Sequence, residues 1–127
     1  MRLLATLIAC IILSACAAPS NGGNDLELSL LRYEKAWRWN NAQVIGYYHK
    51  DAANQTPALA QVEKIRIGKY QVIDRQTVDS RHLKLRVRFT YYLANDIRVK
   101  TRDVDQTWEL DDKLKRWVVT SPIPILE

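Results

Sequence analysis

The chain has 127 residues, of which 26% are charged and 47% are hydrophobic, and its formal net charge is +5. This length predicts one small domain, and two cysteines with two histidines are weak material for a metal centre. We therefore expect no metal ion and no cofactor. The mild positive charge favours an acidic partner or an anionic surface.

The first 16 residues have the order of a secretory signal peptide. One positive charge at Arg2 precedes an apolar run over residues 3–13, and small residues follow it. The run is too short for a membrane-spanning helix, which needs about 20 apolar residues. Residues 13–16, LSAC, resemble the lipobox of bacterial lipoproteins. This resemblance implies cleavage after Ala15 and acylation of Cys16, which would then be the first residue of the mature chain.

The lipobox also bears on location and on the second cysteine. Cys10 lies in the segment that would be removed, so the mature chain would have no free thiol for a disulfide or a metal. The residue after Cys16 is Ala17 rather than Asp, which resembles the pattern of lipoproteins that are anchored in the bacterial outer membrane and face the periplasm. An uncleaved signal anchor and a Gram-positive host stay open as alternatives. An exported chain is not expected to bind nucleic acid.

These observations divide the chain into four parts. We expect a signal peptide over residues 1–15, a flexible tether over 16–23, one domain over 24–121 and an extended tail over 122–127. Removal of the signal peptide would leave 112 residues and, through loss of Arg2, a net charge of +4. Two prolines in the tail remove backbone donors, which favours an edge or a tail over a central strand.

Two helices are predicted at the start of the domain. Asn24 and Glu27 have the spacing of a capping box. Apolar residues then recur at helical spacing in the stripe Leu26, Leu30, Tyr33 and Trp37, with Leu31 widening it. A second capping signature begins at Asn40, which predicts a break there and a second helix to about residue 50. The Thr-Pro pair at residues 56–57 favours one more helical turn.

The pattern changes from helical to strand-like after residue 62. Two isoleucines alternate with cations up to Gly68, and the parity then reverses, which predicts a β-bulge at this glycine. Strict alternation over residues 82–93 predicts a long antiparallel strand with one buried face. The buried set is Leu83, Leu85, Val87, Phe89, Tyr91 and Leu93.

The following strand is predicted to begin at Ile97 and to face Leu93 across a loop over residues 94–96. Its inward set would be Ile97, Val99 and Thr101, followed by Val104, Trp108 and Leu110. This change of parity predicts a bulge around residues 102–103. The expected register pairs Val87 with Val104, Leu83 with Trp108 and Arg86 with Asp105. A tight turn near residues 113–114 would close the sheet and set Leu110 opposite Trp117.

Helices followed by about four antiparallel strands define an α+β class, with N-terminal helices packed on one face of a curved sheet. The layout resembles the cystatin-like fold, and in particular the nuclear-transport-factor-two-like or SnoaL-like superfamily. The features that carry this resemblance are the helix with Tyr33 and Trp37, the restart at residues 40–41, the strand from Leu83, and the hairpin with Trp108 and Trp117. The resemblance implies a cone whose sheet wraps the first helix, with a cavity at the open end.

Seven aromatic residues would line such a cavity: Tyr33, Trp37, Tyr48, Phe89, Tyr91, Trp108 and Trp117. The alternative is that they fill the core, because a small domain must bury large side chains to be stable. Some members of the superfamily use Asp and His inside the cavity. Here His49 and Asp51 lie at a helix end and His82 begins a strand, so we expect exposed side chains and predict no catalytic residue.

Six cations form two rows on the predicted outer face of the sheet: Lys84, Arg86, Arg88, Arg98, Lys100 and Arg102. The expected register sets Arg88 near Arg102, and like charges that face each other destabilise a sheet. Either Asp103 and Asp105 neutralise the rows or an external anion binds them. A solvated sheet face and a docking face for an acidic partner therefore both stay open.

The sequence thus predicts an outer-membrane lipoprotein with a periplasm-facing, noncatalytic binding or assembly domain. Its expected partners are the membrane, through the lipid on Cys16, and an envelope protein or polyanion. A small-molecule enzyme or ligand carrier with an aromatic-lined cavity is the alternative. A homodimer through the sheet face is a third interpretation.

Overall fold

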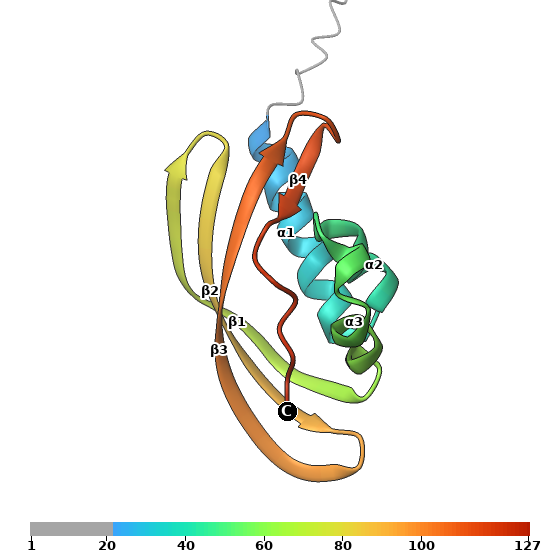
Figure 1. The fold of residues 1–127 in the computed structure, drawn as a ribbon. Coiled ribbons are helices and arrows are strands. Elements are labelled where there is room, and N and C mark those ends of the chain that lie inside the picture. The colour runs from blue at the N-terminus through green and yellow to red at the C-terminus, as the bar shows by residue number, and fades with distance from the viewer. Residues whose placement is uncertain (1–21) are drawn as a thin grey trace, which may run out of the picture.

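The computed structural model describes residues 22–127, so the predicted signal peptide and Cys16 lie outside the described residues, as does most of the predicted tether. The elements in chain order are α1 (Gly22–Arg38), α2 (Ala42–Tyr48), a 3₁₀ turn (Ala52–Asn54), α3 (Thr56–Val62), β1 (Ile65–Asp79), β2 (His82–Leu93), β3 (Asp96–Asp111) and β4 (Arg116–Val119). Figure 1 shows the helices on one side of a strongly curved sheet. This is the α+β arrangement that the sequence predicts. Within residues 22–127, no helix is both long enough and apolar enough to cross a membrane.

Helix α1 presents its predicted stripe to the sheet. Tyr33 and Trp37 are 1% and 0% exposed and belong to the core. Leu31 is 60% exposed, so the prediction that it widens the stripe is wrong. The reason is helical geometry, because neighbouring residues are turned by about 100° around the axis and Leu31 points away from the sheet. The helix begins at Gly22, which puts Asn24 inside it rather than at its cap.

The predicted break between the first two helices is confirmed at Asn40, which has a left-handed φ of 53°. Asparagine tolerates this conformation better than most residues do. Its side-chain amide donates to the Val62 carbonyl at 2.9 Å and also to the Ile65 carbonyl. The cap of α2 is therefore the next residue, Asn41, whose Oδ1 accepts from the Val44 N–H at 3.1 Å.

The four strands form one antiparallel sheet in the order β1-β2-β3-β4. Strand β1 has the predicted irregularity at Gly68, where the register shifts between Ile67 and Lys69. Strand β2 alternates between buried and exposed side chains as predicted. The predicted pairs are also present: Val87 with Val104, Leu83 with Trp108, Arg86 with Asp105, and Leu110 with Trp117.

The turn between β2 and β3 differs from the prediction. Leu93 pairs with Asp96, and the irregularity lies near this turn, between Tyr91 and Leu93, instead of at residues 102–103. Ile97 and Val99 are consequently 91% and 69% exposed rather than inward. The turn is held by local polar contacts, since the Asp96 carboxylate accepts from the Arg98 N–H at 3.1 Å. These contacts define the register at the tip, where there is no core for the two apolar side chains to enter.

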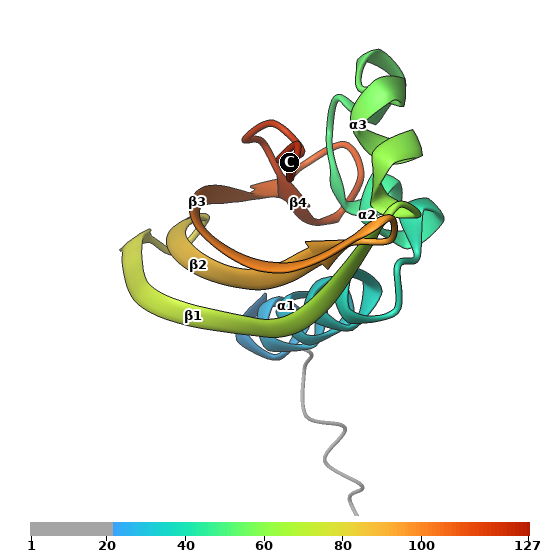
Figure 2. The ribbon, with the colours of Figure 1, turned by 90° about the horizontal axis from the view of Figure 1, so that it is seen from below.

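The segment after β4 has neither helix nor strand, yet it contributes to the core. Ile123 and Leu126 are 3% and 1% exposed. The Ile123 N–H donates to the Gln55 side chain at 2.6 Å, and the Gln61 side chain donates to the Leu126 carbonyl at 2.9 Å. Figure 1 shows this segment running between the sheet and the helices to the C-terminus. Figure 2 shows α1 beside β1, with α2 and α3 grouped at one end of the sheet.

Candidate functional site

The seven aromatic residues predicted to line a cavity are all buried, at 4% exposure or less: Tyr33, Trp37, Tyr48, Phe89, Tyr91, Trp108 and Trp117. Several of their rings pack edge to face, with centroids 5.2 Å apart for Tyr33 and Trp108 and 5.1 Å apart for Trp37 and Phe89. This is the packing of a filled core. Tyr48 and Trp117 also border hollows at the surface.

Two polar side chains lie inside this core and are hydrogen-bonded there. Gln106 is 2% exposed; its amide donates to the Tyr70 hydroxyl at 3.0 Å and its oxygen accepts from Trp108 Nε1 at 3.1 Å. Burial raises the pKa of Tyr70, so its hydroxyl stays protonated. Trp37 Nε1 is buried without an acceptor among residues 22–127.

His49 is the second polar side chain, and the prediction that it is exposed is wrong, since only 4% of it is accessible. Helix α2 ends at Tyr48, and His49 then forms a parallel β-bridge with Val119, the last residue of β4. This bridge places His49 in the interior of the domain. Its Nδ1 lies 3.2 Å from the Ser121 carbonyl, which can only accept, so Nδ1 carries the proton. Nε2 therefore accepts from the Tyr33 hydroxyl at 2.6 Å.

Burial is the main cause of the low basicity of His49. It lowers the pKa of His49 from 6.5 to about 4, and the hydrogen bond to the Ser121 carbonyl partly opposes this shift. The ring is therefore neutral near pH 7, with both nitrogens engaged. The other two candidates do not join it: Asp51 is exposed and accepts from the Asn54 amide, and His82 contacts Asp79 at 2.8 Å. Residues 22–127 also contain no group of three His, Cys, Asp or Glu placed to hold a metal ion.

The predicted outer basic rows are largely neutralised within the sheet. Arg86 donates to Asp105 and Arg88 donates to Asp103, each from Nε at 2.8 Å. These hydrogen bonds lower the pKa of both aspartates, which keeps them ionised. The Arg98 guanidinium pairs with Asp96 of its own strand at 2.7 Å. These three arginines are therefore neutralised by aspartates of the sheet and do not need an external anion. Lys84 has no acidic partner within residues 22–127.

The predicted row on β3, Arg98, Lys100 and Arg102, has the parity of the opposite face, since Ile97 and Val99 take the outward positions. Arg102 pairs with Phe89 and Lys100 pairs with Tyr91, and both aromatic side chains are buried on the inner face. The prediction that Arg88 lies near Arg102 is therefore wrong. The cause is the displaced irregularity near the β2–β3 turn, because a shift of one residue moves a side chain to the other face of a strand. Arg102 donates to the Ile125 carbonyl of the C-terminal segment.

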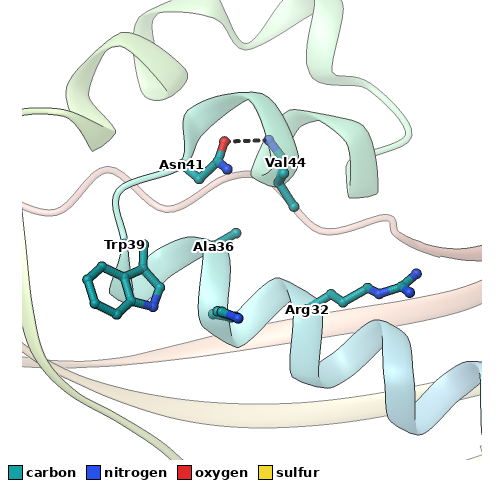
Figure 3. A pocket seen from close by; sticks show the side chains of 6 residues that line it. Arg32, Ala36, Trp39, Asn41 and Val44 are labelled. Atoms are coloured by element: carbon teal, nitrogen blue, oxygen red, sulfur yellow. Dashed lines mark hydrogen bonds between the residues drawn. The ribbon is translucent and has the colours of Figure 1, made fainter.

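A hollow of about 410 Å³ lies outside the core, where α1 turns into α2 (Figure 3). It is lined by Arg32, Lys35, Ala36, Trp39, Asn41 and Val44. Figure 3 shows the Trp39 ring and the Arg32 side chain toward opposite ends, with Ala36 between them and Val44 across from them on α2. The left-handed turn at Asn40 creates this arrangement, because it reverses the chain directly after Trp39.

The hollow differs from the sheet face in its charge. Neither Arg32 nor Lys35 has an acidic partner within the described part of the chain, whereas Arg38 on another face of α1 pairs with Glu34 at 3.4 Å. Trp39 is 74% exposed, the most exposed of the four tryptophans. Unpaired cations beside an exposed tryptophan and a small apolar floor are suited to binding an anionic group with an apolar part.

A second hollow, of about 240 Å³, continues this surface toward the start of α1. It shares Arg32 with the first and is also lined by Leu28, Tyr47, Lys115 and Arg116. The Arg116 guanidinium stacks on the Tyr47 ring at 3.9 Å. We call the two hollows together the α1–α2 groove.

Sequence reasoning did not identify the groove. The available signal was the spacing of Arg32, Lys35 and Trp39, which places them on one helical face that is separate from the buried stripe. A basic and aromatic face of this kind is visible in the sequence. Its contact with α2 and the β3–β4 turn is not, because those segments come next to α1 only in the folded chain.

Comparisons with known proteins support the fold. No model of a known protein family matches the chain, and no curated protein matches it. An NTF-2-like protein of unknown function from Shewanella oneidensis is similar in structure, with a TM-score of 0.52 and 14% identity over 77% of this chain and 93% of that one. A domain of unknown function with a cystatin-like fold from Nostoc punctiforme has a TM-score of 0.57 and 11% identity over 84% of this chain and 80% of that one. The chain therefore has a cystatin-like, NTF-2-like fold.

Proposed function

We propose that this chain is a lipid-anchored envelope protein whose domain is a noncatalytic binding or assembly module. The lipobox at residues 13–16 supports a lipid anchor on Cys16, and Ala17 in place of Asp after it supports an outer-membrane location facing the periplasm. One structural observation carries the proposal of binding without catalysis. The interior is filled by packed aromatic rings, while unpaired cations and an exposed tryptophan gather on the outside, in the α1–α2 groove.

A small-molecule enzyme or ligand carrier is the second candidate, and the buried pair of His49 and Tyr33 is the observation that favours it. The two side chains are 4% and 1% exposed, and both nitrogens of His49 already have partners. A substrate would reach them only if the core opened. Because the pair is closed to a substrate in the folded domain, the enzyme ranks below the binding module.

Two experiments on the full chain test the proposal. Cys16→Ser should abolish incorporation of labelled fatty acid and leave a larger, unprocessed precursor; unchanged labelling would contradict the anchor. For binding, a photocrosslinking residue is placed in turn at Lys35 in the groove and at Lys84 on the sheet face, and intact cells are irradiated. A discrete crosslinked envelope protein at either position supports a binding module, and its absence at both positions contradicts it.

A further inference from the structure

The α1–α2 groove has the length of a short peptide segment. The helical face from Leu28 to Trp39 covers 11 residue steps, or about 16 Å at 1.5 Å per residue. An extended chain of about five residues covers the same distance at 3.3 Å per residue. The two hollows meet at Arg32, so one elongated occupant can contact both.

The charges of the groove are nearly all positive and lack partners. Arg32, Lys35 and Lys115 form no ion pair with any residue of 22–127, and Asp25 is the single acidic residue lining either hollow. Arg116 donates from Nη2 to the Tyr47 carbonyl at 3.0 Å, but its Nε is buried without an acceptor in the same part of the chain. An incoming carboxylate would supply the counter-charge that Arg32, Lys35 and Lys115 lack within residues 22–127.

Apolar and polar surfaces of the groove also fit a peptide. Leu28, Tyr47 and Trp39 are 44%, 53% and 74% exposed, so each offers contact area to an apolar side chain. Asn41 uses its side-chain oxygen to cap α2, which leaves its amide hydrogens available to a peptide carbonyl. The recessed floor at Ala36 and Val44 fits an inserted side chain better than the flat surface of a lipid bilayer does.

We infer that the α1–α2 groove binds an acidic segment of a partner protein, about five residues long when extended, whose apolar side chains enter the hollow beside Trp39. Carboxylates of the segment pair with Lys35 in the first hollow, with Arg32 where the hollows meet, and with Lys115 and Arg116 in the second hollow. Guanidinium and ammonium groups bind carboxylates strongly where water is partly excluded. This inference rests on the proposed binding function and names the class of partner.

The chain carries its own reporter for a test. Of its four tryptophans, Trp39 is exposed, while the other three are 3% exposed or less. The full lipidated chain is labelled with 5-fluorotryptophan, kept in zwitterionic detergent and observed by ¹⁹F NMR, with the Trp39 signal assigned by Trp39→Phe. The probe is a blocked peptide of sequence Glu-Phe-Glu-Leu-Glu, and Lys-Phe-Lys-Leu-Lys is its charge-reversed control.

The acidic peptide should shift the Trp39 signal and leave the signals of Trp37 and Trp108, which line neither hollow, in place. The basic peptide should shift none. The double variant Arg32→Gln with Lys35→Gln should raise the Kd at least tenfold. Its matched control, Lys64→Gln with Lys69→Gln, removes two exposed cations at the sheet edge and should change the Kd less than twofold. Unchanged signals of Trp37 and Trp108 report that each variant is folded.

Three results would overturn the inference: no shift with the acidic peptide, equal weakening by both double variants, or a Trp39 shift with phosphatidylglycerol vesicles but not with the peptide. The last result would assign the groove to a lipid surface. A failed peptide test with crosslinking intact at Lys84 would leave the proposed binding function standing. Absence of crosslinks at every position would overturn the function itself.

Discussion

Trp37 and Trp39 are two residues apart, yet they belong to two regions with opposite properties. Trp37 is 0% exposed and packs on Phe89 in the closed interior, whereas Trp39 is 74% exposed at the edge of the α1–α2 groove. The interior is filled and its buried His and Gln are hydrogen-bonded to internal partners. In the groove, Arg32, Lys35 and Lys115 have no acidic partner among residues 22–127, and Trp39 is exposed. Residues that stabilise the core and residues of the proposed binding groove are therefore separated within one helix.

Arginines show the same contrast between the sheet and the groove. Arg86 and Arg88 are paired with aspartates on the neighbouring strand, while Arg32 has no acidic partner within residues 22–127. The sheet face also carries cations, but the aspartates cancel the charge of Arg86 and Arg88. A row of basic residues in a sequence is therefore a poor guide to a binding surface unless the acidic residues facing it are known.

The largest expected effect is at Trp37. Trp37→Ala should lower the free energy of unfolding by about 3–5 kcal/mol, because it leaves a cavity against Phe89 and Tyr33. Urea unfolding followed by circular dichroism measures this loss. A loss below about 1 kcal/mol would mean that the interior is not closed, and the contrast with the groove would fail.

The pH dependence of stability tests the buried histidine. The pKa of His49 is about 4 in the folded chain against 6.5 when it is unperturbed, so the unfolded chain takes up the proton first as pH falls. Stability is therefore full above pH 6.5 and decreases toward pH 4, by up to about 3 kcal/mol. Unfolding curves between pH 7 and 4.5 measure this slope. His49→Gln should flatten it, and equal slopes in both proteins would show that His49 is not buried in neutral form.

The turn that joins the two regions is tested at Asn40. Asn40→Ala should cost about 2 kcal/mol, because it removes the hydrogen bonds to the Val62 and Ile65 carbonyls and strains a left-handed backbone. Asn40→Gly tolerates the backbone conformation and should cost less. Thermal unfolding of the two variants separates these contributions, and identical midpoints would assign the whole effect to the lost amide.

The smallest expected effect is at Trp39. Trp39→Ala should change the free energy of unfolding by less than about 0.5 kcal/mol, as is usual for exposed positions. The same urea titration as for Trp37→Ala gives a direct comparison. A loss as large as that at Trp37 would mean that Trp39 contributes to the core, and the two regions would then not differ in this way.

Much of the fold could be predicted because its signals are local. The alternation in β2, the irregularity at Gly68 and the break at Asn40 each follow from a few consecutive residues. The failed predictions depend on distant segments. His49 is buried because Val119 and Ser121 meet it from 70 or more residues away, and Arg102 changes face because a turn near Asp96 sets its register.

The element types, the strand alternation and the aromatic content of the core follow from local patterns in the sequence, because periodicity and turn chemistry act over a few residues. Tertiary structure decided whether those aromatics enclose a cavity or fill the interior, which arginines find an aspartate, and where cations remain unpaired. These outcomes depend on which surfaces come together in space. The α1–α2 groove shows this, since Arg32 and Arg116 are far apart in sequence and line one hollow only after folding.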